Sequence, residues 1–266
     1  MATHAHDSIR QTGAKAPKVA PYNPGEPLRR EWGTAWSALR KLVANGDDTV
    51  QVFRIMRALN ADASQKGYRK LIASRDGGRL AYERVELAEK FSDRAWLDAL
   101  PDGTVGAAYR AFLDRTGFSA RGLADISMND YDPDAIVHDH PYTWFGRRER
   151  DMHDIWHTLT GYTAEEHLGE LCLVAFSYAQ TGGLGWAAIG GMGALKSLKM
   201  TRGTDVVKAV LEGYRNGKRA KWLSAQDYVA LLEEPLDAAR RRLSIAEPVL
   251  YHKAQDVLAT RGLSAI

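Results

Sequence analysis

The stretch from Arg148 to Glu170 constrains this chain most, because it predicts two helices joined by a tight turn. Gly161 follows the first helical segment and is typical of a helix end. Thr163 and Glu166 have the spacing of a capping box, which predicts that the second helix starts at Thr163. A hairpin of two antiparallel helices would bring side chains from both of them together.

Three polar side chains of the predicted first helix fall on one side of it. They are His153, Asp154 and His157, since each residue advances by about 100°. Two imidazoles and a carboxylate in such an arc suit a divalent metal. Glu170 is the candidate that completes the set, because its axial offset from His157 across the hairpin is roughly 4–5 Å. The same side chains would also suit a hydrogen-bonded core or surface.

These motifs resemble those of the coenzyme Q biosynthesis protein 4 family, in which HDxxH is followed by TLxG and then by GE. Residues 153–161 match the first two elements, residues 169–170 match GE, and residues 100–109 resemble the family's LPxGTxGxxY segment. The interval between His157 and Glu170 is one residue longer than is usual in the family. Since one residue turns a helix by about 100°, Glu166 or His167 could occupy the ligand position instead.

The resemblance implies a role in ubiquinone biosynthesis, namely oxidative decarboxylation at ring carbon C1 of a polyprenylated hydroxybenzoate, with a hydroxyl replacing the carboxyl. It implies a divalent metal as cofactor, and the donor types suit zinc, iron or manganese alike. The expected metal ligands are His153, Asp154, His157 and Glu170. The expected substrate-binding residues are Arg148, Arg150 and Tyr109, although the two arginines would also suit an exposed charged helix face.

A non-catalytic alternative is a lipid-binding scaffold that organises ubiquinone-biosynthesis enzymes at the membrane around a structural metal. Four protein ligands would favour the scaffold, whereas an open coordination position would favour catalysis. A third alternative, a hydrolase of the HD type, would need a further His and Asp, and only an arbitrary choice such as His138 with Asp205 or Asp227 supplies them.

The expected partners are an isoprenoid lipid such as a polyprenylated quinone precursor, the membrane surface and other ubiquinone-biosynthesis proteins. A homodimer is compatible with the sequence. We expect the protein in the cytoplasm, peripherally on the inner face of the cell membrane, or on the matrix side in a mitochondrion.

Composition predicts an ordinary globular protein, with 45% hydrophobic and 26% charged residues. A formal net charge of +3 gives no strong field for nucleic acid. Helical periodicity dominates, so we predict an all-α fold in which a single helical domain, residues 29–266, follows a flexible N-terminal arm, residues 1–28. The one cysteine, Cys172, is expected in the core.

Several local signals predict where helices begin and end. Asn45-Gly46 should end one helix and Thr49 should open the next, Thr104 should cap a helix, and Asn216-Gly217 should break one.

Three other segments admit a functional reading. Residues 184–195 are apolar and rich in glycine, which suits either a tunnel for an isoprenoid tail or close helix packing. The basic residues of 196–222 could meet anionic lipid headgroups. His138-Asp139-His140 is a second candidate ligand cluster.

Overall fold

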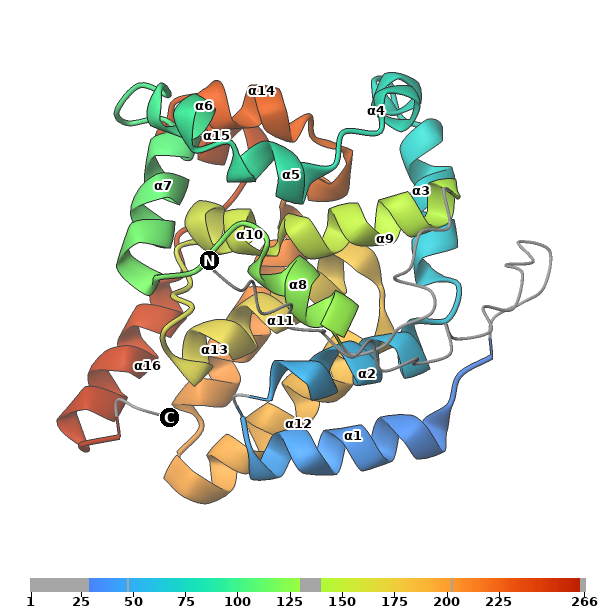
Figure 1. The fold of residues 1–266 in the computed structure, drawn as a ribbon. Helices are drawn as coiled ribbons and strands as arrows, with labels where there is room; N and C mark the ends of the chain where they lie inside the picture. Colours follow the sequence, from blue (N-terminus) through green and yellow to red (C-terminus); the bar gives the residue numbers. More distant parts are fainter. Residues whose placement is uncertain (1–28, 47, 130–139, 202, 264–266) are drawn as a thin grey trace, which may run out of the picture.

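The computed structural model describes residues 29–46, 48–129, 140–201 and 203–263 (Figure 1). Over these ranges the chain is built of helices and contains no strand, apart from one isolated bridge between Thr104 and Pro235, so the all-α prediction is confirmed. The arm predicted for residues 1–28 lies outside the described ranges.

The helices are α1 (Trp32–Ala44), α2 (Thr49–Asn60), α3 (Ala63–Ile72), α4 (Gly77–Glu83), α5 (Leu87–Ser92), α6 (Arg94–Asp98), α7 (Val105–Thr116), α8 (Gly122–Asn129), α9 (Pro141–Asp151), α10 (His153–Thr160), α11 (His167–Thr181), α12 (Leu184–Thr201), α13 (Asp205–Arg219), the 3₁₀ turn η1 (Leu223–Ala225), α14 (Tyr228–Glu233), α15 (Leu236–Leu243) and α16 (Val249–Thr260).

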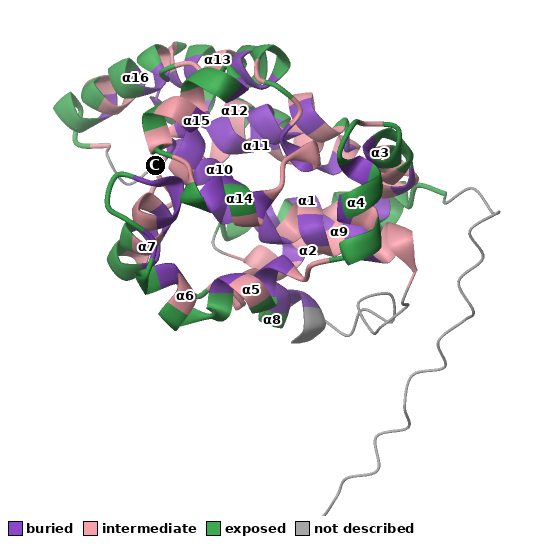
Figure 2. Cartoon of the chain, turned by 90° about the horizontal axis from the view of Figure 1, so that it is seen from above, coloured by how far each residue is buried: buried purple, intermediate pink, exposed green. Residues whose placement is uncertain are grey.

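Helix α11 forms the centre of the main hydrophobic core, because its sides face α10, α12, α13 and α16. Figure 2 shows it largely in the colour of buried residues. Cys172, Leu173 and Phe176 have no exposed surface. Burial also raises the pKa of the Cys172 thiol, which fits the core role predicted for this cysteine.

The predicted break at Asn216-Gly217 is wrong, because α13 continues to Arg219. The glycines of this helix permit close packing against α11 instead. A Cβ at Gly217 would lie 2.6 Å from the carbonyl oxygen of Phe176, and one at Gly213 would overlap the carbonyl oxygen of Cys172. Tertiary packing therefore outweighs the local preference of glycine for a turn.

A second, smaller core lies between α1, α2 and α12 and includes Leu39, Ile55 and Leu59. The glycines of α12 bring this helix close to its neighbours. A Cβ at Gly185 would lie 3.0 Å from the side-chain oxygen of Asn60 on α2, and one at Gly190 would lie 3.3 Å from Val174 on α11. These glycines therefore allow close helix packing, which is one of the two interpretations given above for residues 184–195.

The predicted helix boundaries at the N-terminal side are confirmed. Asn45 is the C-cap of α1, and α2 begins at Thr49. Thr104 is the N-cap of α7, and its hydroxyl accepts a hydrogen bond of 3.1 Å from the backbone N–H of Ala107.

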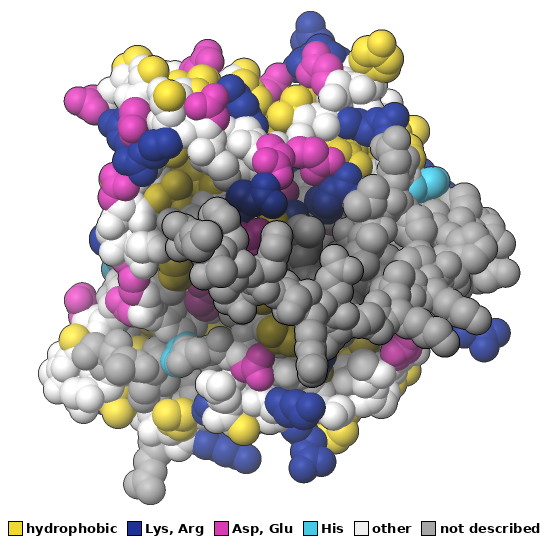
Figure 3. All heavy atoms as spheres, viewed as in Figure 1, with side chains coloured by type: hydrophobic (Ala, Val, Ile, Leu, Met, Phe, Trp, Pro, Cys, Tyr) yellow, Lys and Arg dark blue, Asp and Glu magenta, His cyan; other side chains and the backbone are white. Residues whose placement is uncertain are grey.

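On the face seen in Figure 3, acidic and basic side chains are interspersed.

Glu149 on α9 is a carboxyl group whose environment favours the protonated form. Its Oε1 accepts a 3.4 Å hydrogen bond from the Ser224 hydroxyl, and burial raises its pKa to about 8. Because this pKa exceeds that of the unfolded chain, the folded state binds the proton more tightly between the two values. Stability should therefore fall as the pH rises from the unfolded pKa towards 8.

We expect Glu149→Gln to stabilise the protein relative to wild type at about pH 9 and to have little effect at about pH 3.5, where both states carry a mostly neutral group. Denaturant unfolding at the two pH values measures this difference. An equal effect at both pH values would show that Glu149 does not titrate as described.

Candidate metal centre

Helix α10 carries both histidines and is fixed firmly at its C-terminal end. Gly161 ends it with φ +80°, and the Gly161 N–H donates to the carbonyl of His157 at 2.9 Å. Arg240 of α15 reaches across and donates to two otherwise unpaired helix-end carbonyls, those of Thr158 at 3.1 Å and Leu159 at 2.9 Å. These contacts fix the helix that carries the imidazole rings of both histidines.

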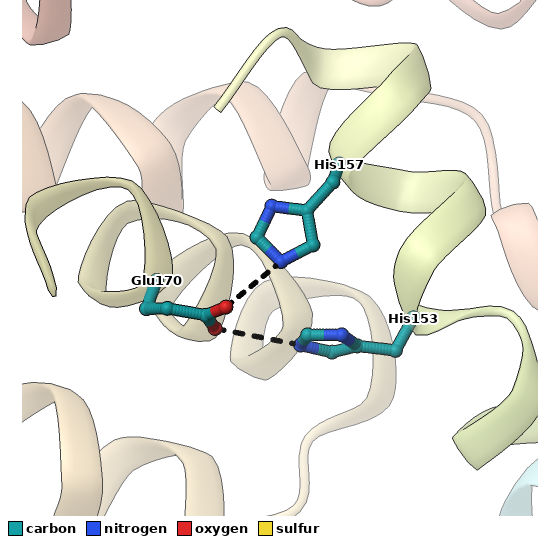
Figure 4. A group of neighbouring side chains, drawn as sticks. All are labelled: His153, His157 and Glu170. Atoms are coloured by element: carbon teal, nitrogen blue, oxygen red, sulfur yellow. Dashed lines mark ion pairs between the residues drawn. The ribbon is translucent and has the colours of Figure 1, made fainter. Parts of the chain in front are cut away.

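Glu170 of α11 faces both histidines (Figure 4). Its Oε1 lies 3.2 Å from Nε2 of His157, and its Oε2 lies 3.8 Å from Nε2 of His153. One ligand atom from each of the three side chains falls within 4.8 Å of the others, a spacing that a single metal ion can bridge.

The tautomer of His157 is set by its other ring nitrogen. Nδ1 lies 2.8 Å from the carbonyl oxygen of Tyr162 and must donate to it, so in the neutral ring Nε2 presents a lone pair. That lone pair faces the Glu170 carboxylate, and Nε2 is buried without a hydrogen bond within the described chain. Two facing acceptors need a cation or a proton between them, and the residues therefore fit a metal ion.

His157 and Glu170 each stabilise the charged form of the other. Burial lowers the pKa of His157, but the Glu170 carboxylate outweighs this and leaves the pKa above its usual value. Desolvation raises the pKa of Glu170, but His157, His153 and His167 leave it below its usual value. The site thus favours an anionic carboxylate facing positive charge.

Asp154 contacts His153 and is not a member of the group formed by His153, His157 and Glu170. Its Oδ1 lies 3.3 Å from Nδ1 of His153, on the ring edge that does not face Glu170, and it is not part of the three-residue group. A carboxylate behind a ligating imidazole fixes the tautomer and orientation of the ring. In this position Asp154 can orient His153, and its own role as a metal ligand stays a prediction.

We expect Asp154→Asn to weaken metal affinity by roughly 10–100-fold without abolishing it, because such outer partners typically contribute that much. Metal titration of the variant against wild type measures the change. A complete loss of binding, equal to that of a histidine ligand variant, would instead assign Asp154 as a direct ligand.

Two aromatic side chains enclose the histidines, and sequence analysis did not assign them to the site. Phe112 of α7 stacks on His157 at 5.8 Å between ring centroids, and Trp186 of α12 stacks on His153 at 6.1 Å. Both come from other parts of the chain, so no local pattern near the histidines indicated them. They hold the rings in place and make one wall of the site apolar.

The alternative ligands, Glu166 and His167, do not join the group. The predicted capping box is wrong: α11 begins at His167, and the Glu166 carboxylate accepts hydrogen bonds of 3.0 and 3.2 Å from Gln255 of α16. Thr163 also contacts α16, through the hydroxyl of Tyr251. Because residues 163–166 are not helical, the extra residue is absorbed before α11 and Glu170 keeps its place.

The three predicted substrate-binding residues lie in different surroundings. Arg150 donates from Nε to Asp151 at 2.7 Å. Tyr109 is buried, and burial followed by the charges of Asp154 and Asp151 raises its pKa, so its hydroxyl stays protonated. Arg148 points elsewhere, towards η1 and α14, where its guanidinium donates to the carbonyl of Ser224.

Of the second candidate cluster, His138 and Asp139 lie outside the described residues. His140 is the N-cap of α9, and its Nδ1 accepts from the backbone N–H of Tyr142 at 3.2 Å. That bond assigns His140 a capping role.

The fold and the site together define a class of helical proteins in which a His-x-x-x-His helix and a following glutamate form a candidate metal centre. Residues 27–249 match the family model described as "Coenzyme Q (ubiquinone) biosynthesis protein Coq4". The chain belongs to this family of ubiquinone biosynthesis proteins.

Curated relatives agree with this assignment. The chain is 31% identical over 191 residues to the "Ubiquinone biosynthesis protein COQ4 homolog, mitochondrial" of Danio rerio, covering 68% of this chain and 66% of that protein. It is 28% identical over 193 residues to the protein of the same name from Homo sapiens, covering 70% and 69%. The chain thus spans about two thirds of the length of these relatives.

A solved structure has the same fold. A crystal structure described as that of a candidate ubiquinone biosynthesis protein from Nostoc punctiforme superposes with a TM-score of 0.59 at 21% identity, covering 82% of this chain and 100% of that one. Across the described part of our chain, no helix has the length and apolar character needed to cross a bilayer.

Proposed function

We propose that this protein acts in ubiquinone biosynthesis as a metal-dependent oxidative decarboxylase of a polyprenylated hydroxybenzoate. The carboxyl at ring carbon C1 leaves as CO₂ and a hydroxyl takes its place: ArCOOH + H₂O → ArOH + CO₂ + 2H⁺ + 2e⁻. The C–C bond to the carboxyl breaks, a C–O bond forms, and dioxygen or another oxidant accepts the electrons.

The observation that carries this proposal is the open side of the metal centre. The described chain offers three ligands, and the Glu170 side chain is 39% exposed, whereas the His157 side chain is 1% exposed. A structural site usually closes around the ion with four protein ligands, whereas a catalytic site keeps a position for water or substrate. The site residues thus support catalysis over a purely structural metal.

His153, His157 and Glu170 would hold the ion, and Asp154 would orient His153. When bound, zinc, iron or manganese would supply a Lewis acid for the substrate's carboxylate and phenolic oxygens, and iron or manganese would also supply a redox centre.

The neighbouring side chains have complementary roles towards the aromatic acid. Arg150 carries nitrogens beyond the Nε that binds Asp151, and a guanidinium is suited to a carboxylate. Tyr109 offers a neutral hydroxyl as hydrogen-bond donor. Phe112 and Trp186 supply an apolar wall that excludes water around the ring.

The test uses full-length protein reconstituted separately with iron, manganese and zinc, and a polyprenylated hydroxybenzoate with a ¹³C-labelled carboxyl. We expect labelled CO₂ and the hydroxylated ring product with wild type, and neither with Glu170→Gln. Glu166→Gln is the matched control, because Glu166 binds Gln255 outside the metal group. Metal-loaded wild type that binds the lipid but releases no CO₂ would contradict the decarboxylase function.

A second candidate function is a lipid-binding scaffold at the membrane, and the surface of α1 and α12 favours it. Trp32 and Trp36 of α1 are 64% and 56% exposed, and Leu195 and Met200 of α12 are each 49% exposed. Lysines 196 and 199 accompany these apolar side chains on α12. Exposed tryptophans and lysines suit an anionic membrane surface. A scaffold at the membrane requires such a docking surface, whereas a decarboxylase does not.

A further inference from the structure

A pocket of about 200 Å³ is lined by residues of α4, α9 and α14 and of the segment from Val85 to Leu87. Its walls combine apolar side chains, including Leu80 and Val229, with the ring of Tyr228 and a few charged groups. His153, His157 and Glu170 do not contribute to its lining.

Arg148 brings a buried positive charge to this pocket. The residue is 3% exposed and makes no ion pair with a carboxylate of the described chain. Nε and Nη2 donate to the carbonyl oxygens of Ser224 and Gln226, and the guanidinium carbon lies 5.3 Å from the ring centre of Tyr228. Nη1 makes no hydrogen bond to a described residue. Buried charges are normally paired, so this one can accept an anionic partner.

The carboxylates of the pocket are already engaged. Arg79 binds Asp227 at 2.6 Å and Glu83 at 2.7 Å. Asp227 also accepts from the backbone N–H groups of Val229 and Ala230 at 3.1 and 3.2 Å, at the start of α14. These two acids add negative charge near Arg148, which disfavours a dianion such as phosphate. Among the described residues that line the pocket, Arg148 is the cation without a carboxylate partner, and a monoanion matches its single charge better.

We propose that this pocket binds a small monocarboxylate with an apolar body. The carboxylate would pair with the Arg148 guanidinium, and the body would pack on Leu80, Val229 and the Tyr228 ring. The pocket volume limits the ligand to a small molecule, so a prenylated lipid is not its ligand. This site is independent of the metal centre and of the function proposed for it.

Isothermal titration of the full-length protein with cyclohexanecarboxylate tests the proposal, with cyclohexanol and inorganic phosphate as comparison ligands. We expect the carboxylate to bind at least about tenfold more tightly than the alcohol, because a hydrogen bond to a charged group contributes that much. Arg148→Met should weaken carboxylate binding by at least about tenfold. Val229→Phe fills the pocket while leaving the contacts of Arg148, and it should abolish binding.

The double variant His153→Ala/His157→Ala separates this site from the metal centre and should retain carboxylate affinity. Thermal unfolding checks that each variant is folded. If Arg148→Met does not fold, the binding result for Val229→Phe tests the proposal. No binding to wild type, unchanged binding in Val229→Phe, or phosphate binding tighter than the carboxylate would each overturn the proposal. So would binding that is lost in the histidine variant and kept in Val229→Phe.

Discussion

Replacing His157 with alanine is expected to remove stoichiometric divalent metal from the purified protein. His157 is buried, its Nδ1 is committed to the Tyr162 carbonyl, and its free Nε2 faces Glu170 at 3.2 Å. The substitution removes a ligand itself, so affinity should fall by more than the roughly 10–100-fold that loss of an outer partner costs. Metal content after reconstitution and titration with zinc, iron and manganese measure the effect.

His167→Ala is the matched control, because it removes an imidazole from the start of the same helix as Glu170 but outside the three-residue group. It should retain the metal. Glu170→Gln provides a second test if the alanine variant does not fold, since it changes charge and hardly changes shape. Equal metal content in wild type, His157→Ala and Glu170→Gln would contradict the metal centre.

Gly169→Ala is expected to destabilise the protein and to lower its metal occupancy. A Cβ at this position would lie 2.9 Å from both the nitrogen and the carbonyl carbon of Thr163, and closer still to its oxygen. Backbone atoms cannot move aside as a flexible side chain can, so we expect a loss of about 1–3 kcal/mol or more. Thr163 follows Tyr162, whose carbonyl holds His157, so a displaced loop should also disturb the site.

Gly191→Ala is the control that separates packing from helix propensity. Gly191 lies within α12 and a Cβ there would meet nothing within 4 Å. Alanine favours a helix over glycine by up to about 1 kcal/mol, so this variant should be as stable as wild type or slightly more so. Chemical denaturation gives both free energies of unfolding. If Gly169→Ala proved as stable as Gly191→Ala, the close approach of Thr163 would not constrain position 169.

The histidine pair could be predicted from sequence because its geometry is local. His153 and His157 lie one turn apart in α10, so spacing alone places them on one face. The choice between Glu170 and Glu166 could not be made in this way. It depends on residues 163–166, which bind Tyr251 and Gln255 of α16 instead of forming helix.

The misplaced helix break at Asn216-Gly217 has a similar origin. Locally this pair favours a turn, but Gly217 packs against the backbone of Phe176 and Asn216 donates to the Tyr162 hydroxyl at 3.5 Å. Both contacts join segments that are distant in sequence. The roles of Phe112 and Trp186 could not be predicted either. Periodicity indicates which aromatic residues face the core, but it does not indicate which ring each of them stacks on.

The contacts of α16 also bear on the order in which the chain can acquire its final structure. The family match ends at residue 249, where α16 begins, yet Tyr251 accepts from the Thr163 N–H across 88 positions of sequence. The loop that presents the Tyr162 carbonyl to His157 is therefore completed only when the last described helix has docked. During synthesis the histidine-bearing helix emerges long before that docking can occur. We therefore expect the binding-competent arrangement to form late in folding, although its recognisable motif is short and local.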